Sequence, residues 1–99
     1  MSIKFTSKDL FKRYGSLSFG EVVKSFREAD EMSQVEFAKK LGMSSANLCD
    51  IEKGRKVPSP RRAVTIAKKL GISEILLLQL ALQGMLEKDK LKFKVSVAS

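Results

Sequence analysis

The sequence predicts an all-α domain of five short helices, and three kinds of signal support this prediction. Apolar residues recur at helical spacing, as in the first stretch with Phe19, Val22, Val23 and Phe26. A serine stands at the expected N-cap of every stretch, and glycine closes three of them. We expect a bundle over residues 19–86, a basic extension over 1–18 and a strand or tail over 87–99.

The first helix begins at a capping box formed by Ser18 and Glu21. Before it, Ile3 and Phe5 alternate with polar residues, and a helical patch with Leu10, Phe11 and Tyr14 follows.

Two short helices then follow, joined by a Gly-Met turn. Ser33 and Glu36 form a second capping box, and Ser44 is a natural N-cap for the second helix. The inward residues are Phe37, Ala38 and Leu41 in the first helix, closed by Gly42, and Leu48 and Ile51 in the second, closed by Gly54. Small residues at Ala38 and Gly42 allow close crossing, so this is the layout of a helix-turn-helix, a motif that places its second helix in a DNA groove.

The fourth helix begins at Ser59 and Pro60, turns Ala63, Ile66, Ala67 and Leu70 inward, and ends at Gly71. Ser73 caps a fifth helix, Glu74 to about Leu86, that is apolar nearly all round. A small domain cannot cover such a helix, and an uncovered apolar face favours a two-fold dimer. We expect the dimer interface at Ile75, Leu76, Leu78, Leu82, Leu86 and Phe93. Alternatively, the helix simply fills the core under the basic leader.

The last residues alternate between charged and apolar side chains. Leu91, Phe93, Val95 and Val97 fall on one side, which is the period of a β-strand. A lone strand needs an edge, either residues 2–5 of its own chain, a second subunit or another protein. A disordered basic tail is the alternative.

The composition indicates a small DNA-binding protein rather than an enzyme. In 99 residues, 19 basic and 11 acidic side chains give a net charge of +8, which favours a polyanionic partner. The chain has no His, a single Cys, no metal-ligand spacing and no glycine-rich phosphate loop, so we expect no catalysis, metal or cofactor. It shows no secretory signal or membrane-spanning run, and we expect a cytoplasmic location.

The central residues resemble the phage Cro and repressor-like (XRE-like) helix-turn-helix family. The likeness covers roughly Phe19 to Leu82; Gln34 directly after the Ser33 cap fits it, and residues 51–55 (IEKGR) are similar to the family's Ile/Leu-Glu-x-Gly-Lys/Arg ending. It implies a five-helix, repressor-like bundle that binds double-stranded DNA. It also implies that Arg27 and Glu52 form a structural ion pair, as related repressors often do.

The resemblance and the helix geometry together suggest which residues meet DNA. The residues expected to face base edges are Ser45, Ala46, Asn47, Cys49 and Asp50. The residues expected to meet phosphates are Gln34, Lys53, Arg55, Lys56, Arg61 and Arg62. A solvated surface run is the alternative for the cations. A redox switch at Cys49 is less favoured than a small spacer, because no resolving Cys or fixed basic neighbour is evident.

Two functions are compatible with this pattern. The first is a transcriptional regulator, expected to be a repressor, that binds palindromic operator DNA as a homodimer. The second is an antitoxin-like protein that regulates its own operon and neutralises a partner toxin by strand addition through residues 1–18 or 88–99.

Overall fold

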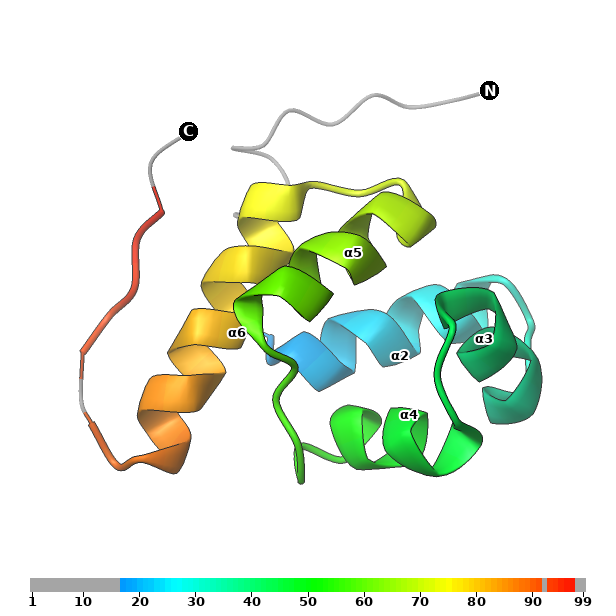
Figure 1. Ribbon diagram of the computed structural model, residues 1–99, viewed down its shortest axis with the longest axis horizontal. Helices are drawn as coiled ribbons and strands as arrows, with labels where there is room; N and C mark the ends of the chain where they lie inside the picture. Colours follow the sequence, from blue (N-terminus) through cyan, green and yellow to red (C-terminus); the bar gives the residue numbers. More distant parts are fainter. Residues whose placement is uncertain (1–16, 92, 98–99) are drawn as a thin grey trace.

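The computed structural model describes residues 17–91 and 93–97, and every regular element within them is a helix. The helices are α2 (Phe19–Ala29), α3 (Gln34–Leu41), α4 (Ser45–Glu52), α5 (Pro60–Leu70) and α6 (Glu74–Lys88) (Figure 1). The all-α prediction is therefore confirmed. The patterns at Ile3, Phe5, Leu10, Phe11 and Tyr14 lie outside the described residues. None of the described helices is long and apolar enough to cross a membrane.

The five helices begin and end by shared local rules. Each is preceded by a serine whose side-chain oxygen accepts a hydrogen bond from an amide of the first turn. Each is followed by an amide that donates to a carbonyl five residues back, across one residue in the left-handed conformation. That residue is glycine after α3, α4 and α5, but Glu31 after α2 and Lys90 after α6.

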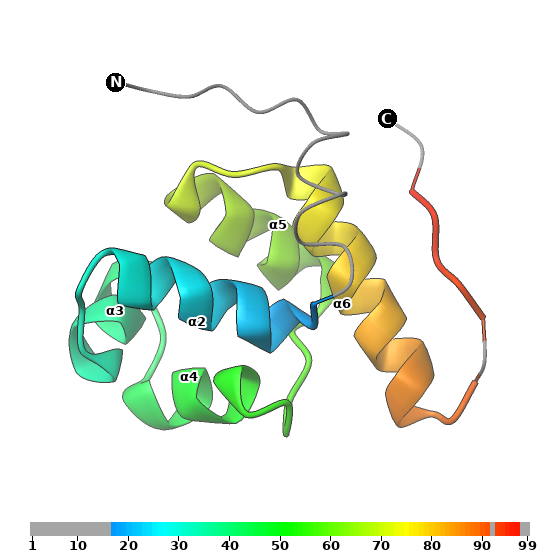
Figure 2. The same cartoon turned by 180° about the vertical axis from the view of Figure 1, so that it is seen from behind.

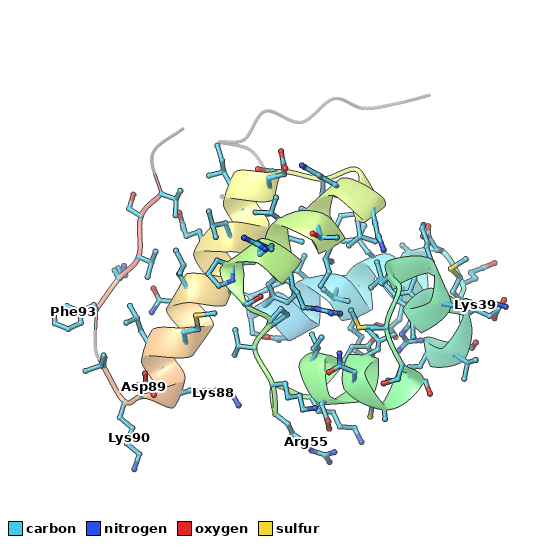
Figure 3. All side chains as sticks on the ribbon, in the orientation of Figure 1. Lys39, Arg55, Lys88, Asp89, Lys90 and Phe93 are labelled. Carbon is cyan, nitrogen blue, oxygen red and sulfur yellow. The ribbon has the colours of Figure 1, made fainter. Side chains whose placement is uncertain are left out.

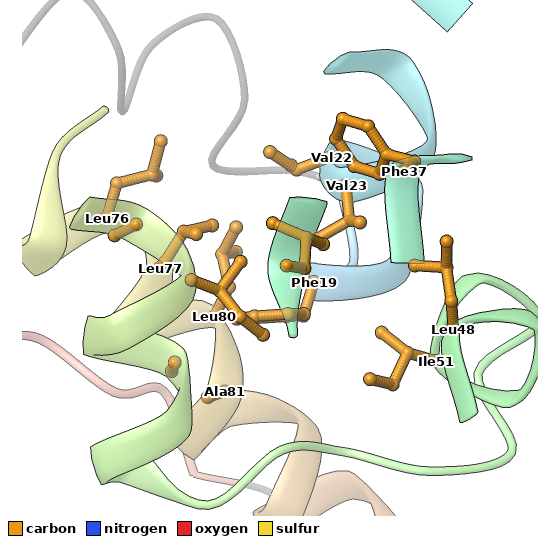
Figure 4. Packing of buried hydrophobic residues seen from close by; sticks show 14 of the residues in the cluster. Phe19, Val22, Val23, Phe37, Leu48, Ile51, Leu76, Leu77, Leu80 and Ala81 are labelled. Carbon is orange, nitrogen blue, oxygen red and sulfur yellow. The ribbon is translucent and has the colours of Figure 1, made fainter. Parts of the chain in front are cut away.

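The core lies between α2, the α3–α4 pair and the α5–α6 pair (Figure 4). Phe37, Leu48, Ile66, Leu76 and Leu77 are its largest fully buried side chains. They come from α3, α4, α5 and α6, and Val22 and Val23 of α2 are fully buried among them. One apolar cluster therefore joins all five described helices.

Gly20 determines how closely α2 approaches α4. A Cβ atom at this position would lie 2.0 Å from the carbonyl oxygen of Ile51 and 3.0 Å from that of Glu52. Both neighbours are backbone atoms, so they cannot move aside as a flexible side chain would. Only glycine permits this contact between the first helix and the end of α4.

The structure corrects one residue of the predicted dimer surface. Leu76, with Leu77, Leu80 and Ala81, is buried in the core, so a partner cannot reach it. Ile75, Leu78, Leu82 and Leu86 are partly exposed. The apolar helix thus fills the core with one side and presents the other at the surface.

The predicted C-terminal strand is not formed in the described residues. Residues 93–97 run back along α6 (Figures 1 and 2), and side chains of that helix bind their backbone. Charged and apolar side chains do alternate along this segment, but its backbone is hydrogen-bonded to a helix and not to another strand. Phe93, one of the predicted interface residues, is 66% exposed.

Candidate nucleic-acid interface

The two central helices form a helix-turn-helix. Gly42, in the left-handed conformation, ends α3, and α4 begins three residues later at Ser45, directly after its Ser44 cap. The Lys69 ammonium from α5 also donates to the Leu41 carbonyl at 3.2 Å, which fixes the end of α3. Within α4, the buried apolar residues are Leu48 and Ile51.

The remaining side of α4 is open to solvent. Ser45 and Ala46 are exposed, while Asn47, Cys49 and Asp50 are partly exposed. These are the residues predicted to face bases, and they lie on one short helix along one edge of the molecule (Figure 1). Cys49 is a free thiol.

A polar network ties this helix to α2 and α3. The Arg27 guanidinium donates to both carboxylate oxygens of Glu52, at 2.8 and 3.0 Å, and to the Met32 carbonyl at 3.0 Å. Side-chain exposure is only 15% for Arg27 and 2% for Glu52. Hydrogen bonding to Glu52 raises the pKa of Arg27 above its ordinary value. The end of α4 is thereby held by a bidentate ion pair that is largely shielded from solvent.

Gln34 belongs to the same network. Its side-chain amide donates to Oε1 of Glu52 at 3.1 Å, and the residue is partly buried. The sequence-based prediction gave Gln34 to a phosphate, whereas the structure places its amide nitrogen on Glu52. One amide hydrogen and the side-chain oxygen are left for a ligand.

Most predicted phosphate-binding cations gather after α4. Lys53, Arg55 and Lys56 are exposed, and Arg61 and Arg62 are exposed on the first turn of α5. Arg55 and Lys56 are not independent, because Asp50 pairs with both, at 3.3 and 3.7 Å. Sequence reasoning gave Asp50 only a base-facing role and missed this pairing.

A signal for that pairing exists in the chain. Gly54 is left-handed and lets the amides of Arg55 and Lys56 fold back onto the Asp50 carbonyl, at 2.8 and 3.2 Å. In this chain, the left-handed turn at Gly54 therefore brings the Arg55 side chain back to the Asp50 carboxylate. Lys88 at the end of α6 completes this corner, since its ammonium donates to the Arg55 carbonyl (Figure 3).

Comparison with known proteins agrees with the geometry of the motif. The helix-turn-helix family matches residues 23–77, more than half of the chain. The "ImmF control region 10 kDa protein" of Bacillus phage phi105 is 44% identical over 48 residues, which are 48% of this chain and 53% of that protein. The chain thus spans about half the length of this relative. No solved structure matches the present chain.

The match spans most of α2, the α3–α4 motif, α5 and the start of α6, which are the elements that position the open side of α4. The chain therefore belongs to the XRE-type helix-turn-helix family of DNA-binding transcription regulators.

Proposed function

We propose that this regulator is a repressor that binds palindromic operator DNA as a homodimer, with α4 of each copy in the major groove. The observation that supports this most strongly is the contrast between the two sides of α4. Its inner side and its end are fixed by Leu48, Ile51 and the Glu52 network, while its outer side is open. A rigidly held helix with a free polar face suits major-groove recognition.

Base reading rests on short side chains. Asn47 can pair with adenine, and Asp50 can accept from the amino group of cytosine. Ser45 and Ala46 offer only a hydroxyl and a methyl contact. Asp50 also holds Arg55 and Lys56, so DNA phosphates compete with it for these cations. We infer that direct readout is modest and that phosphate attraction supplies much of the affinity.

The proposed dimer uses the partly exposed side of α6. Lys88 at the end of this helix contacts the loop that follows α4. Two copies that meet along the C-terminal half of α6 would therefore be joined near their α4 helices. For a two-fold dimer, this proposal expects half-sites about one helical turn of DNA apart.

The salt dependence of DNA binding tests the placement of the phosphate contacts. In the variant Arg55→Ala/Lys56→Ala, we expect the slope of log affinity against log salt to flatten by about 2, on operator and random DNA alike. Lys68→Ala is the matched control, because Lys68 pairs with Glu74 at the far end of α5, and its slope should not change. A loss confined to one DNA sequence would contradict the assignment.

The identity of the bases read is tested separately. Exchanging Asn47 and Asp50 should change which operator is preferred in a selection from random duplexes. An unchanged preference would mean that recognition is made by DNA shape or by other residues.

A second candidate function is antitoxin-like capture of a partner protein by strand addition. It is favoured by the outer edge of residues 93–97: in the described part of the chain, the Lys94 and Ser96 amides donate no hydrogen bond, while those of Val95 and Val97 bind α6. An open edge of this kind accepts a further strand. If a neighbouring gene encodes a toxin, the full chain should protect cells from it and a chain ending at Lys90 should not. Equal protection by both chains would exclude strand addition by this segment.

A further inference from the structure

The C-terminal segment, described over residues 93–97, is bound by two glutamines on one face of α6. Gln79 and Gln83 are four residues apart and therefore lie one above the other on the helix. Gln83 donates to the Phe93 carbonyl at 2.9 Å and accepts from the Val95 amide at 2.8 Å, while Gln79 accepts from the Val97 amide at 3.3 Å. We call these three hydrogen bonds the amide clasp.

The spacing of the clasp suits an extended chain. Four helical residues separate the glutamines by about 6.0 Å along the axis, and two residues of extended chain span about 6.6 Å. The glutamines therefore offer a helix face that binds alternate backbone groups, much as the edge of a sheet does. Nothing in these bonds depends on whether the bound segment comes from the same chain.

Folding back onto its own helix forces the chain through an unfavourable turn. Lys90, two residues after α6 ends at Lys88, takes a φ of 59°, the left-handed conformation. The same position holds glycine after α3, α4 and α5. A residue with a Cβ atom resists this conformation. In the closed chain, this left-handed residue closes α6, because the Leu91 amide donates across it to the Leu86 carbonyl, and it also turns the segment back onto the helix.

The closed arrangement also covers little apolar surface. Leu91 is 45% exposed and Phe93 is 66% exposed, and Phe93 points away from α6 (Figure 3). A groove of about 620 Å³ remains between the segment and the helix, lined by residues that include Gln83 and Val95. The backbone of the segment is thus bound to α6 and its two valines are partly buried, while Leu91 and Phe93 remain exposed.

We propose that two copies exchange their C-terminal segments, so that the segment of each copy occupies the amide clasp of the other. This proposal rests on the homodimer of the proposed function and specifies how the two copies are connected. Exchange keeps the three hydrogen bonds of each clasp and releases the left-handed turn at Lys90. It also brings Leu91 and Phe93 to the partner's α6, whose Leu82 and Leu86 are partly exposed.

Residue 90, the hinge of the proposed exchange, provides the test, because a substitution there changes the cost of the left-handed conformation that the closed chain requires. Lys90→Gly removes the Cβ and should favour the closed monomer, whereas Lys90→Val adds a β-branched residue and should favour exchange. The two variants are matched, since both lose the same charge. By sedimentation equilibrium over a range of concentrations, we expect the Lys90→Val dimer to be tighter than the Lys90→Gly dimer by about twenty-five-fold, because each of the two hinges contributes about fivefold.

The clasp itself is tested by Gln79→Ala/Gln83→Ala, which should sediment as a monomer while its helical circular dichroism remains that of the wild type. Equal dissociation constants for the two hinge variants, or a clasp variant that dimerises like the wild type, would overturn segment exchange. The dimer of the proposed repressor would then be formed by packing of α6 of one copy against α6 of the other. A wild-type chain that stays monomeric even on operator DNA would overturn both proposals.

Discussion

The half of the molecule that holds α4 and the half formed by α6 and the C-terminal segment are stabilised in different ways. Around α4, the Arg27–Glu52 pair is nearly buried, and Gly20 brings two helices into backbone contact. Around the C-terminal segment, the bonds come from glutamine side chains at the surface, and the helix ends in a left-handed lysine. The helix α4 is therefore held by a buried ion pair and by a backbone contact between helices, whereas the C-terminal segment is held only by glutamine side chains at the surface of α6.

The largest loss should follow from breaking the buried ion pair in the α4 half. Arg27→Met leaves the Glu52 carboxylate, only 2% exposed, without its cation, and we expect a loss of about 3–5 kcal/mol in unfolding free energy. Urea denaturation measures it. The double variant Arg27→Met/Glu52→Leu is the control and should recover much of the loss. A single variant as stable as the wild type would mean that this half is not held by buried charge.

Filling the contact between α2 and α4 should cost nearly as much. In Gly20→Ala, the new methyl would lie 2.0 Å from a backbone oxygen, and we expect about 3 kcal/mol of destabilisation by urea denaturation. Gly84→Ala in α6 is the matched control, because its nearest neighbour is a Val57 methyl at 3.2 Å, which can yield. If the two substitutions cost the same, the two halves do not differ in how closely they are packed.

A local change at the end of α2 should have a smaller and opposite effect. Glu31 takes a φ of 54°, so Glu31→Gly should stabilise the protein by about 1 kcal/mol in thermal or urea unfolding. It serves as a reference for Lys90→Gly, since both replace a left-handed residue after a helix. If the chain is a closed monomer, Glu31→Gly and Lys90→Gly should raise the unfolding free energy equally. A rise for Glu31→Gly alone would show that residue 90 has already left the left-handed conformation.

The smallest effect should come from acid. Hydrogen bonds from the Ser18 and Ser33 backbone amides lower the pKa values of Glu21 and Glu36 below their ordinary 4.5. Their stabilisation is therefore complete above pH 4.5 and is lost as the pH falls through the lower folded values. Glu21→Gln/Glu36→Gln should flatten this part of the stability curve. An unchanged curve below pH 4.5 would exclude the two capping boxes as its cause.

Local signals allowed the helices to be predicted, and long-range contacts explain what was missed. The Ser18, Ser33 and Ser44 caps act within one turn, so sequence alone placed these helix starts correctly. Leu76 was misplaced because a helix that is apolar nearly all round does not show which side faces the core. The prediction of a C-terminal strand was wrong for the described residues, because alternating side chains indicate an extended backbone and do not show what that backbone is hydrogen-bonded to.

The candidate site shows the same division. The solvent-exposed side of α4 can be predicted from the sequence, because the spacing of Leu48 and Ile51 shows which side is buried. The contact of Gly20 with Ile51 joins residues far apart in the chain, and no local pattern reveals it. The pairing of Asp50 with Arg55 depends on the left-handed turn at Gly54, which brings the two side chains together, and the predicted DNA roles of the two residues do not reveal it.

The central claim is that a dimer presents two α4 helices to a palindromic operator. Sedimentation of the purified chain at physiological salt, alone and with self-promoter or random DNA, tests it most directly. The account predicts a dimer in which two chains bind one promoter duplex, in preference to random DNA. A monomer that binds both DNAs equally, or neither, would contradict it.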